Sequence, residues 1–87
     1  MKNYAKKILP HYQGIFKDLE REERKQRELA KAHLVYVVRQ IKLEGIVTSK
    51  DILSLTDTLN DLAEANRERQ QAQRYINMLH DIIEHLH

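Results

Sequence analysis

The sequence has no cysteine and no tryptophan, and it contains only two glycines and one proline among 87 residues. Without cysteine, the chain forms neither disulfides nor thiolate metal sites, so oligomerisation is the common route left for stabilising so small a domain. No run of about 20 apolar residues is present, and the N-terminus lacks the apolar stretch of a signal peptide. We therefore expect a single cytoplasmic domain over residues 1–87 with no membrane segment.

The residues that are abundant favour helix. Glu, Lys, Arg, Gln, Leu and Ala dominate, and nowhere do strand-forming residues alternate cleanly with polar ones. Charge is unevenly distributed, because residues 1–45 carry 11 basic and 6 acidic residues, whereas residues 46–87 carry 4 and 7. Such asymmetry can steer two copies together or attract an anionic partner, although ordinary helix-surface charge would look the same.

The N-terminal third, residues 1–28, is a charged helical segment. Pro10 interrupts its apolar pattern, so we expect residues 2–8 to form a short or frayed segment and the first firm helix to begin at Pro10. The stretch EREERKQR at 20–27 is polar on every face, and we expect the helix to continue through it. The apolar residues of this segment recur in helical steps and are candidate partner-binding residues, unless they pack on the same chain: Tyr4, Ile8, Tyr12, Phe16 and Leu19.

The turn between residues 45 and 48 is the strongest local signal in the chain. Gly45 can adopt the left-handed conformation that ends a helix, with Ile46 packing back on Ile41 as in a Schellman motif. Thr48 is a good N-cap for the following helix, and Asp51 suits its positive end. The sequence therefore predicts a helical hairpin over residues 29–87.

The helix after this turn loses its apolar pattern in the middle, at Asn66, Arg69 and Gln73, and regains it at Ile76. We expect a break or kink near Asn66. The predicted fold is all-α, a helical hairpin or small bundle of three to four helices, completed by dimerisation because one chain cannot cover its apolar rows. The predicted dimer and core residues are Leu34, Val37, Val38, Ile41, Ile52, Leu55, Leu59, Leu62, Ile76, Leu79 and Ile83.

No motif for catalysis is present. The chain has no glycine-rich phosphate loop, nucleophile elbow or metalloprotease signature, so we expect no enzymatic activity, no cofactor and no small-molecule substrate. His80, Glu84 and His87 share one helical face that could hold zinc or nickel, but a further ligand is needed and we predict no metal site. His33 lacks the lysine and glycine that usually follow a phosphoacceptor histidine.

DNA binding is the main alternative to a protein target. Basic residues of the N-terminal half could attract phosphate, but interspersed glutamates weaken that attraction. The helix after the turn offers only Lys50 as a cation and carries acidic residues that would repel phosphate. The possible nucleic-acid contacts are Lys6, Lys7, Lys17, Arg21, Arg24 and Lys25.

Residues from about Leu34 to Leu86 resemble a family of small helical regulators. The resemblance is carried by Val37–Val38, Ile41, Gly45, Val47, Lys50, Ile52–Leu53, Leu55, Leu59, Tyr75, Leu79 and Ile82–Ile83. In this order of an apolar helix, a glycine turn, a capped leucine-rich helix, a polar break and a final apolar helix, the chain is similar to the YmgB/AriR family of small enterobacterial biofilm and acid-stress regulators, described as two-component connector proteins. The resemblance implies an all-α homodimer that contacts a response regulator or DNA.

The absence of catalytic motifs and the resemblance to small regulators favour the same functional hypothesis. We expect a small regulatory or adaptor protein that binds and modulates a protein target through a helical face, as a homodimer. The alternative is a transcription regulator that touches DNA with its basic N-terminal half.

Overall fold

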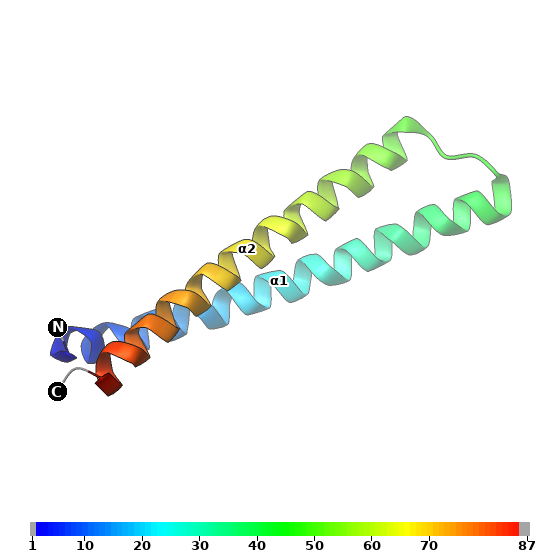
Figure 1. Ribbon diagram of the computed structural model, residues 1–87. Coiled ribbons are helices and arrows are strands. Elements are labelled where there is room, and N and C mark those ends of the chain that lie inside the picture. Colours follow the sequence, from blue (N-terminus) through cyan, green and yellow to red (C-terminus); the bar gives the residue numbers. More distant parts are fainter. Residues whose placement is uncertain (1, 86–87) are drawn as a thin grey trace.

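The computed structural model describes residues 2–85, which form two long antiparallel helices (Figure 1). Helix α1 spans Lys2–Glu44 and helix α2 spans Ser49–His85, with a short turn between them. The expected all-α fold is confirmed, whereas the described residues contain two helices instead of three or four. The hairpin measures 65 × 15 × 15 Å, so its turn lies far from the two chain ends.

The two helices contact each other along a strict seven-residue repeat. The least exposed positions of both helices recur in alternating steps of four and three, which is the spacing of a two-stranded coiled coil. We call these positions the seam; in α1 they are Ala5, Leu9, Tyr12, Phe16, Leu19, Glu23, Gln26, Ala30, His33, Val37 and Gln40. In α2 they are Asp51, Leu55, Thr58, Leu62, Ala65, Arg69, Ala72, Ile76, Leu79 and Ile83.

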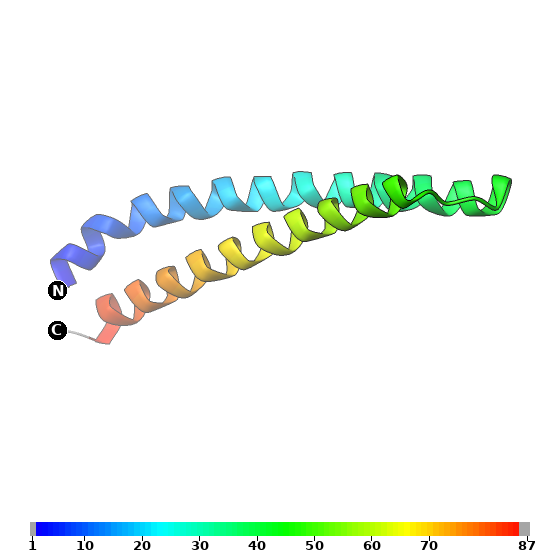
Figure 2. The same ribbon diagram turned by 90° about the horizontal axis from the view of Figure 1, so that it is seen from above.

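A repeat of 3.5 residues per turn makes two helices supercoil, because an untwisted α-helix has 3.6 residues per turn. The two views show this winding. The ribbons overlap near the chain ends in Figure 1 and near the turn in Figure 2, so the direction from one helix to the other rotates along the rod.

Helix α1 runs through Pro10 without a break, so the predicted frayed segment over residues 2–8 is wrong. Proline inside a helix removes one hydrogen bond and costs roughly 3 kcal/mol. Packing offsets this cost, because Ala5 is buried and Ile8 and Leu9 are partly buried before the proline. Pro10 itself is exposed, which leaves water free to satisfy the unpaired carbonyl.

Helix α2 is also continuous, so the predicted break near Asn66 is wrong. The polar residues in its middle face a buried carboxylate on α1. One oxygen of Glu23 accepts hydrogen bonds from Arg69 Nε at 2.5 Å and Asn66 Nδ2 at 3.3 Å, and the other accepts from Arg27 Nη2 at 2.6 Å. The apolar stripe is interrupted there because polar side chains of the two helices hydrogen-bond to each other across the seam.

Gly45 and Thr48 take their predicted roles at the turn, whereas the predicted Schellman ending of the first helix does not form among the described residues. Gly45 has a φ of 67° and donates its amide to the carbonyls of Ile41 and Gln40, each at 3.1 Å. Among the described residues the Ile46 amide makes no Schellman bond to Ile41, so the ending is the simpler αL type. Thr48 and Asp51 form a reciprocal capping box, with Asp51 N donating to Thr48 Oγ1 at 3.2 Å. The N-cap prediction is confirmed.

Candidate protein-binding surface

Exposed apolar side chains concentrate in the half of the hairpin next to the turn. Of the fifteen large apolar side chains exposed among residues 2–85, eleven lie between residues 29 and 59. A radius of gyration of 19.3 Å, against about 12 Å for a compact domain of this length, shows how much surface a rod leaves uncovered. We call residues 29–64 the turn half and the remaining described residues the terminal half.

The predicted dimer and core residues divide into three groups. Val37, Ile76 and Leu79 are buried within the single hairpin, and Leu55, Leu62 and Ile83 are partly buried. The other five are exposed in the single chain: Leu34, Val38, Ile41, Ile52 and Leu59. All five belong to the turn half. In this part of the molecule, each helix therefore carries apolar side chains that the other helix of the same hairpin does not cover.

Half of the seam positions in the turn half are polar, namely His33, Gln40, Asp51 and Thr58. His33 Nδ1 lies 2.8 Å from Thr58 Oγ1, and Thr58 Oγ1 donates to the carbonyl of Ser54 at 2.9 Å. In the tautomer that carries its hydrogen on Nδ1, His33 donates to the Thr58 hydroxyl while that hydroxyl donates to the Ser54 carbonyl, and the His33–Thr58 contact joins the two helices. A seam position that could hold leucine is thus occupied by a hydrogen-bonded pair, and the aliphatic residues stand beside it.

The five exposed aliphatic residues lie on one flank of the hairpin. Leu34 follows His33, and Leu59 follows its partner Thr58; seven residues nearer the turn, Ile41 and Ile52 repeat this arrangement. Arg27 and Asn66, one repeat farther from the turn, line a shallow cavity of about 300 Å³ together with Leu59. We call Leu34, Val38, Ile41, Ile52 and Leu59 the tip flank.

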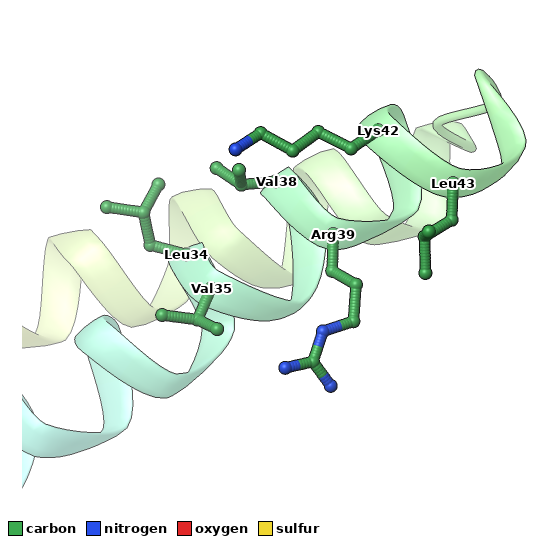
Figure 3. Close-up of a pocket in the computed structure, with 6 residues that line it drawn as sticks. All are labelled: Leu34, Val35, Val38, Arg39, Lys42 and Leu43. Carbon is green, nitrogen blue, oxygen red and sulfur yellow. The ribbon is translucent and has the colours of Figure 1, made fainter.

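A groove also runs along the outer face of α1 in the turn half (Figure 3). Leu34, Val38 and Lys42 form one side and Val35, Arg39 and Leu43 the other, each row following the i, i+4 spacing. Adjacent rows of this kind form the ridges and grooves through which helices pack on one another. The volume of this outer groove is about 460 Å³, and its floor is apolar with two cations at the rim.

The N-terminal residues expected to bind a partner lie in a different setting. Tyr12, Phe16 and Leu19 are partly buried seam residues that face α2, and the Tyr12 ring stacks on Tyr75 with ring centroids 5.6 Å apart. Ile8 is also partly buried, whereas Tyr4 is exposed. Residues 2–28 therefore belong to the hairpin as the terminal half of α1, packed against the end of α2.

Sequence reasoning missed the most buried charged group. Glu23 is 4% exposed, and its partners Arg69 and Arg27 reach toward solvent with 27% and 48% of their side-chain surfaces accessible. All buried polar side-chain atoms in the described residues have partners. The signal was present, since Glu23 and Arg69 each occupy a position where the seven-residue repeat requires a core residue.

The six basic residues considered for nucleic acid are all exposed on the terminal half of α1. Lys17, Arg21 and Arg24 follow one another in steps of four and three, so they lie on one side of the helix, and Lys17 also lines a cavity with Gln73 and Ile76 of α2. Arg21 pairs with Asp18 at 3.6 Å.

The histidines near the C-terminus were considered as metal ligands. His87 lies outside the described residues. Asp81, Glu84 and His85 bring ligand atoms within 4.8 Å of one another, all on exposed side chains. Three solvated groups on one turn of helix lack the fixed donor geometry and hydrogen-bonded support of a protein metal site.

Comparisons with models of protein families, with curated proteins and with solved structures found no match for this chain. In residues 2–85, neither helix has a stretch long and apolar enough to cross a bilayer.

Proposed function

We propose that this chain is a non-enzymatic regulatory or adaptor protein that binds a protein target through its turn half and works as a homodimer. The observation that carries the proposal is the concentration of exposed apolar side chains between residues 29 and 59. Large apolar side chains exposed together in one part of a molecule are costly in water and are typical of protein-binding sites.

The outer groove is the proposed contact for the target. Its two parallel rows fit a helix laid across α1, since ridges of one helix fill grooves of the other. Arg39 and Lys42 at the rim favour acidic residues on that helix. The resemblance implied a response regulator or DNA as the partner, and of these we propose a protein target for this groove.

A matched pair of variants tests this proposal. Val35→Glu with Leu43→Glu places charge on one side of the groove but leaves the seam and the tip flank unchanged. Tyr4→Glu with Met78→Glu makes the same chemical change at exposed residues of the terminal half. Each variant is immobilised beside the wild type and exposed to an extract of the source organism, and every retained protein is then purified and titrated directly.

The expected result is a target that the wild type and the terminal-half variant retain and that the groove variant binds about 30-fold more weakly, the effect of losing a central anchor. Equal binding by all three proteins would contradict the assignment of the groove. Far-UV circular dichroism shows whether each variant keeps its helices.

DNA binding is a second candidate, supported by the exposed cations Lys17, Arg21 and Arg24 along one side of α1. Contacts to phosphate release counterions, so the affinity for a duplex would fall steeply as salt rises. Three such contacts predict a slope of about −3 in a plot of log affinity against log salt concentration. Replacing all three residues by glutamine should abolish this slope, and a target bound through the groove should show little salt dependence.

A further inference from the structure

We infer that a DNA duplex docks on one flank of the terminal half, where cations of α1 stand beside a row of side-chain amides of α2. The inference rests on the second candidate function, DNA binding, and assigns both the surface and the part that α2 plays in it. This surface shares no residue with the outer groove or the tip flank, so a protein target can be bound at the same time.

Two neighbouring cavities lie between α1 and α2 on one flank of the hairpin. Their volumes are about 390 and 300 Å³, and each is lined by side chains of both helices. Residues that lie whole repeats away from the lining residues share this flank, because both helices follow a seven-residue repeat. We call this surface the polar flank; it comprises Lys17, Glu20, Arg24 and Arg27 of α1 and Asn66, Gln70, Gln73 and Asn77 of α2.

The fold separates the acidic side chains from the cations with which they are interspersed in the sequence. Glu23 is almost fully buried and accepts hydrogen bonds from Arg69 and Arg27. Glu22 lies on the opposite flank, where it lines a cavity of about 190 Å³ with carboxylates of α2, namely Asp61, Glu64 and Glu68. Of the residues on the polar flank, only Glu20 is acidic. The glutamates that weaken the attraction for phosphate in the sequence therefore lie mostly away from this surface.

The two flanks are far enough apart to act separately on a charged partner. The hairpin is 15 Å thick, whereas the Debye length is about 10 Å at 0.1 M salt. A phosphate on the polar flank therefore interacts mainly with the cations there. The opposite flank repels phosphate, so the charge distribution steers a polyanion to one side of the rod.

The donors of the polar flank suit a chain of phosphates. Lys17 and Arg24 stand one repeat apart, about 10 Å along α1, and the amides of α2 form a parallel row in which Gln73 donates to Asn77 at 2.9 Å. Phosphate and sugar oxygens accept hydrogen bonds from Asn and Gln as well as from Lys and Arg.

The composition of the polar flank favours nucleic acid over protein as its partner. None of its residues is apolar, so it lacks the aromatic and aliphatic anchors of a protein interface. Interfaces with DNA are more polar and more positively charged than interfaces between proteins. The amides add hydrogen bonds without adding charge, so the salt dependence of binding still comes from the cations of α1.

Fluorescence anisotropy of the full chain with a fluorescein-labelled DNA duplex tests this surface. A duplex of about 20 base pairs is as long as the 65 Å rod, since each base pair adds about 3.4 Å. Gln70→Glu adds a carboxylate to the polar flank, whereas Gln71→Glu makes the same change at the next residue, which lines a cavity on the opposite flank. At about 0.1 M salt, Gln70→Glu should weaken binding at least about threefold, and Gln71→Glu should leave it unchanged.

Removing a carboxylate tests the same surface in the other direction, and an unfolded variant cannot mimic the result. Glu20→Gln takes the single carboxylate off the polar flank, and Glu22→Gln makes the same change at an exposed residue of the opposite flank. Glu20→Gln should tighten binding about threefold, because it removes repulsion between like charges close to the phosphates, whereas Glu22→Gln should not. Equal effects of the two variants within either matched pair would overturn the inference.

Competition distinguishes nucleic acid from an acidic protein as the partner. Unlabelled duplex should displace the labelled duplex at about one tenth of the charge concentration that poly-L-glutamate needs, and equal potency of the two competitors would overturn the inference. These outcomes are separable from failure of DNA binding itself. A wild type that binds no duplex removes the second candidate function together with the inference. A wild type that binds with the expected salt dependence, but whose matched variants do not differ, overturns the polar flank alone.

Discussion

Removing the Glu23 carboxylate is the sharpest test of how the two helices are held in register. Glu23 joins α1 to the middle of α2 through Arg69 and Asn66, and it is almost fully buried. Substitution by alanine removes both cross-helix hydrogen bonds and leaves the Arg69 guanidinium in the seam without its counter-charge.

The expected cost follows from what each partner loses. A hydrogen bond to a charged group contributes about 1.5–3 kcal/mol, and the Arg69 contact is the better placed of the two across the seam. Arg27 is about half exposed, so its pair within α1 contributes only about 0.3–0.5 kcal/mol. Because Arg69 can still reach water, we expect Glu23→Ala to cost about 2–3 kcal/mol, or roughly 10–20 °C in Tm.

The double substitution Glu23→Leu with Arg69→Leu separates the net value of the charge pair from the cost of breaking it. Two leucines at these positions complete an apolar seam, so we expect the double variant to match or exceed the stability of the wild type. Each single leucine variant should be destabilised, and the coupling between the sites should be about 2 kcal/mol.

Urea denaturation followed by far-UV circular dichroism measures these differences at one fixed protein concentration, because the measured stability of an associating protein depends on its concentration. Glu20→Ala, an exposed carboxylate one helical turn away, is the control and should change stability by less than about 0.5 kcal/mol. A cost for Glu23→Ala no larger than that of the control, or additive effects in the double variant, would refute this account of the central cluster.

Three further predictions concern the backbone, and thermal unfolding checks each. Gly45→Ala should destabilise the hairpin by about 1–2 kcal/mol, because an alanine at φ 67° is strained. Gly14→Ala should stabilise α1 by about 0.5–1 kcal/mol, because the added methyl group meets only open space. Changes in Tm of the same sign for the two variants would contradict this reasoning. Thr48→Ala should cost about 1 kcal/mol through loss of the capping box, and no change would mean that the cap is dispensable. Pro10→Ala should raise Tm and slow amide exchange of the flanking α1 residues, since it restores a helical donor; unchanged exchange would show that the proline does not limit this end.

The sequence alone determined the helical class and the turn. Few glycines and prolines, helix-forming composition and apolar residues in steps of three and four can be read from the chain because they act locally. Gly45, Thr48 and Asp51 could be assigned for the same reason, since each satisfies backbone groups within a few residues of itself.

Only the tertiary structure decided which polar residues continue a helix and which apolar residues remain exposed. In the sequence, Asn66 and Arg69 suggest a helix break because they interrupt the apolar pattern. In the structure, both hydrogen-bond to Glu23 of the other helix, 43 and 46 residues away in sequence. Leu34, Val38 and Ile41 resemble core residues until the seam is found to run through Ala30, His33 and Val37 beside them. The periodicity of a single helix cannot distinguish two adjacent stripes, because the choice depends on where the second helix lies.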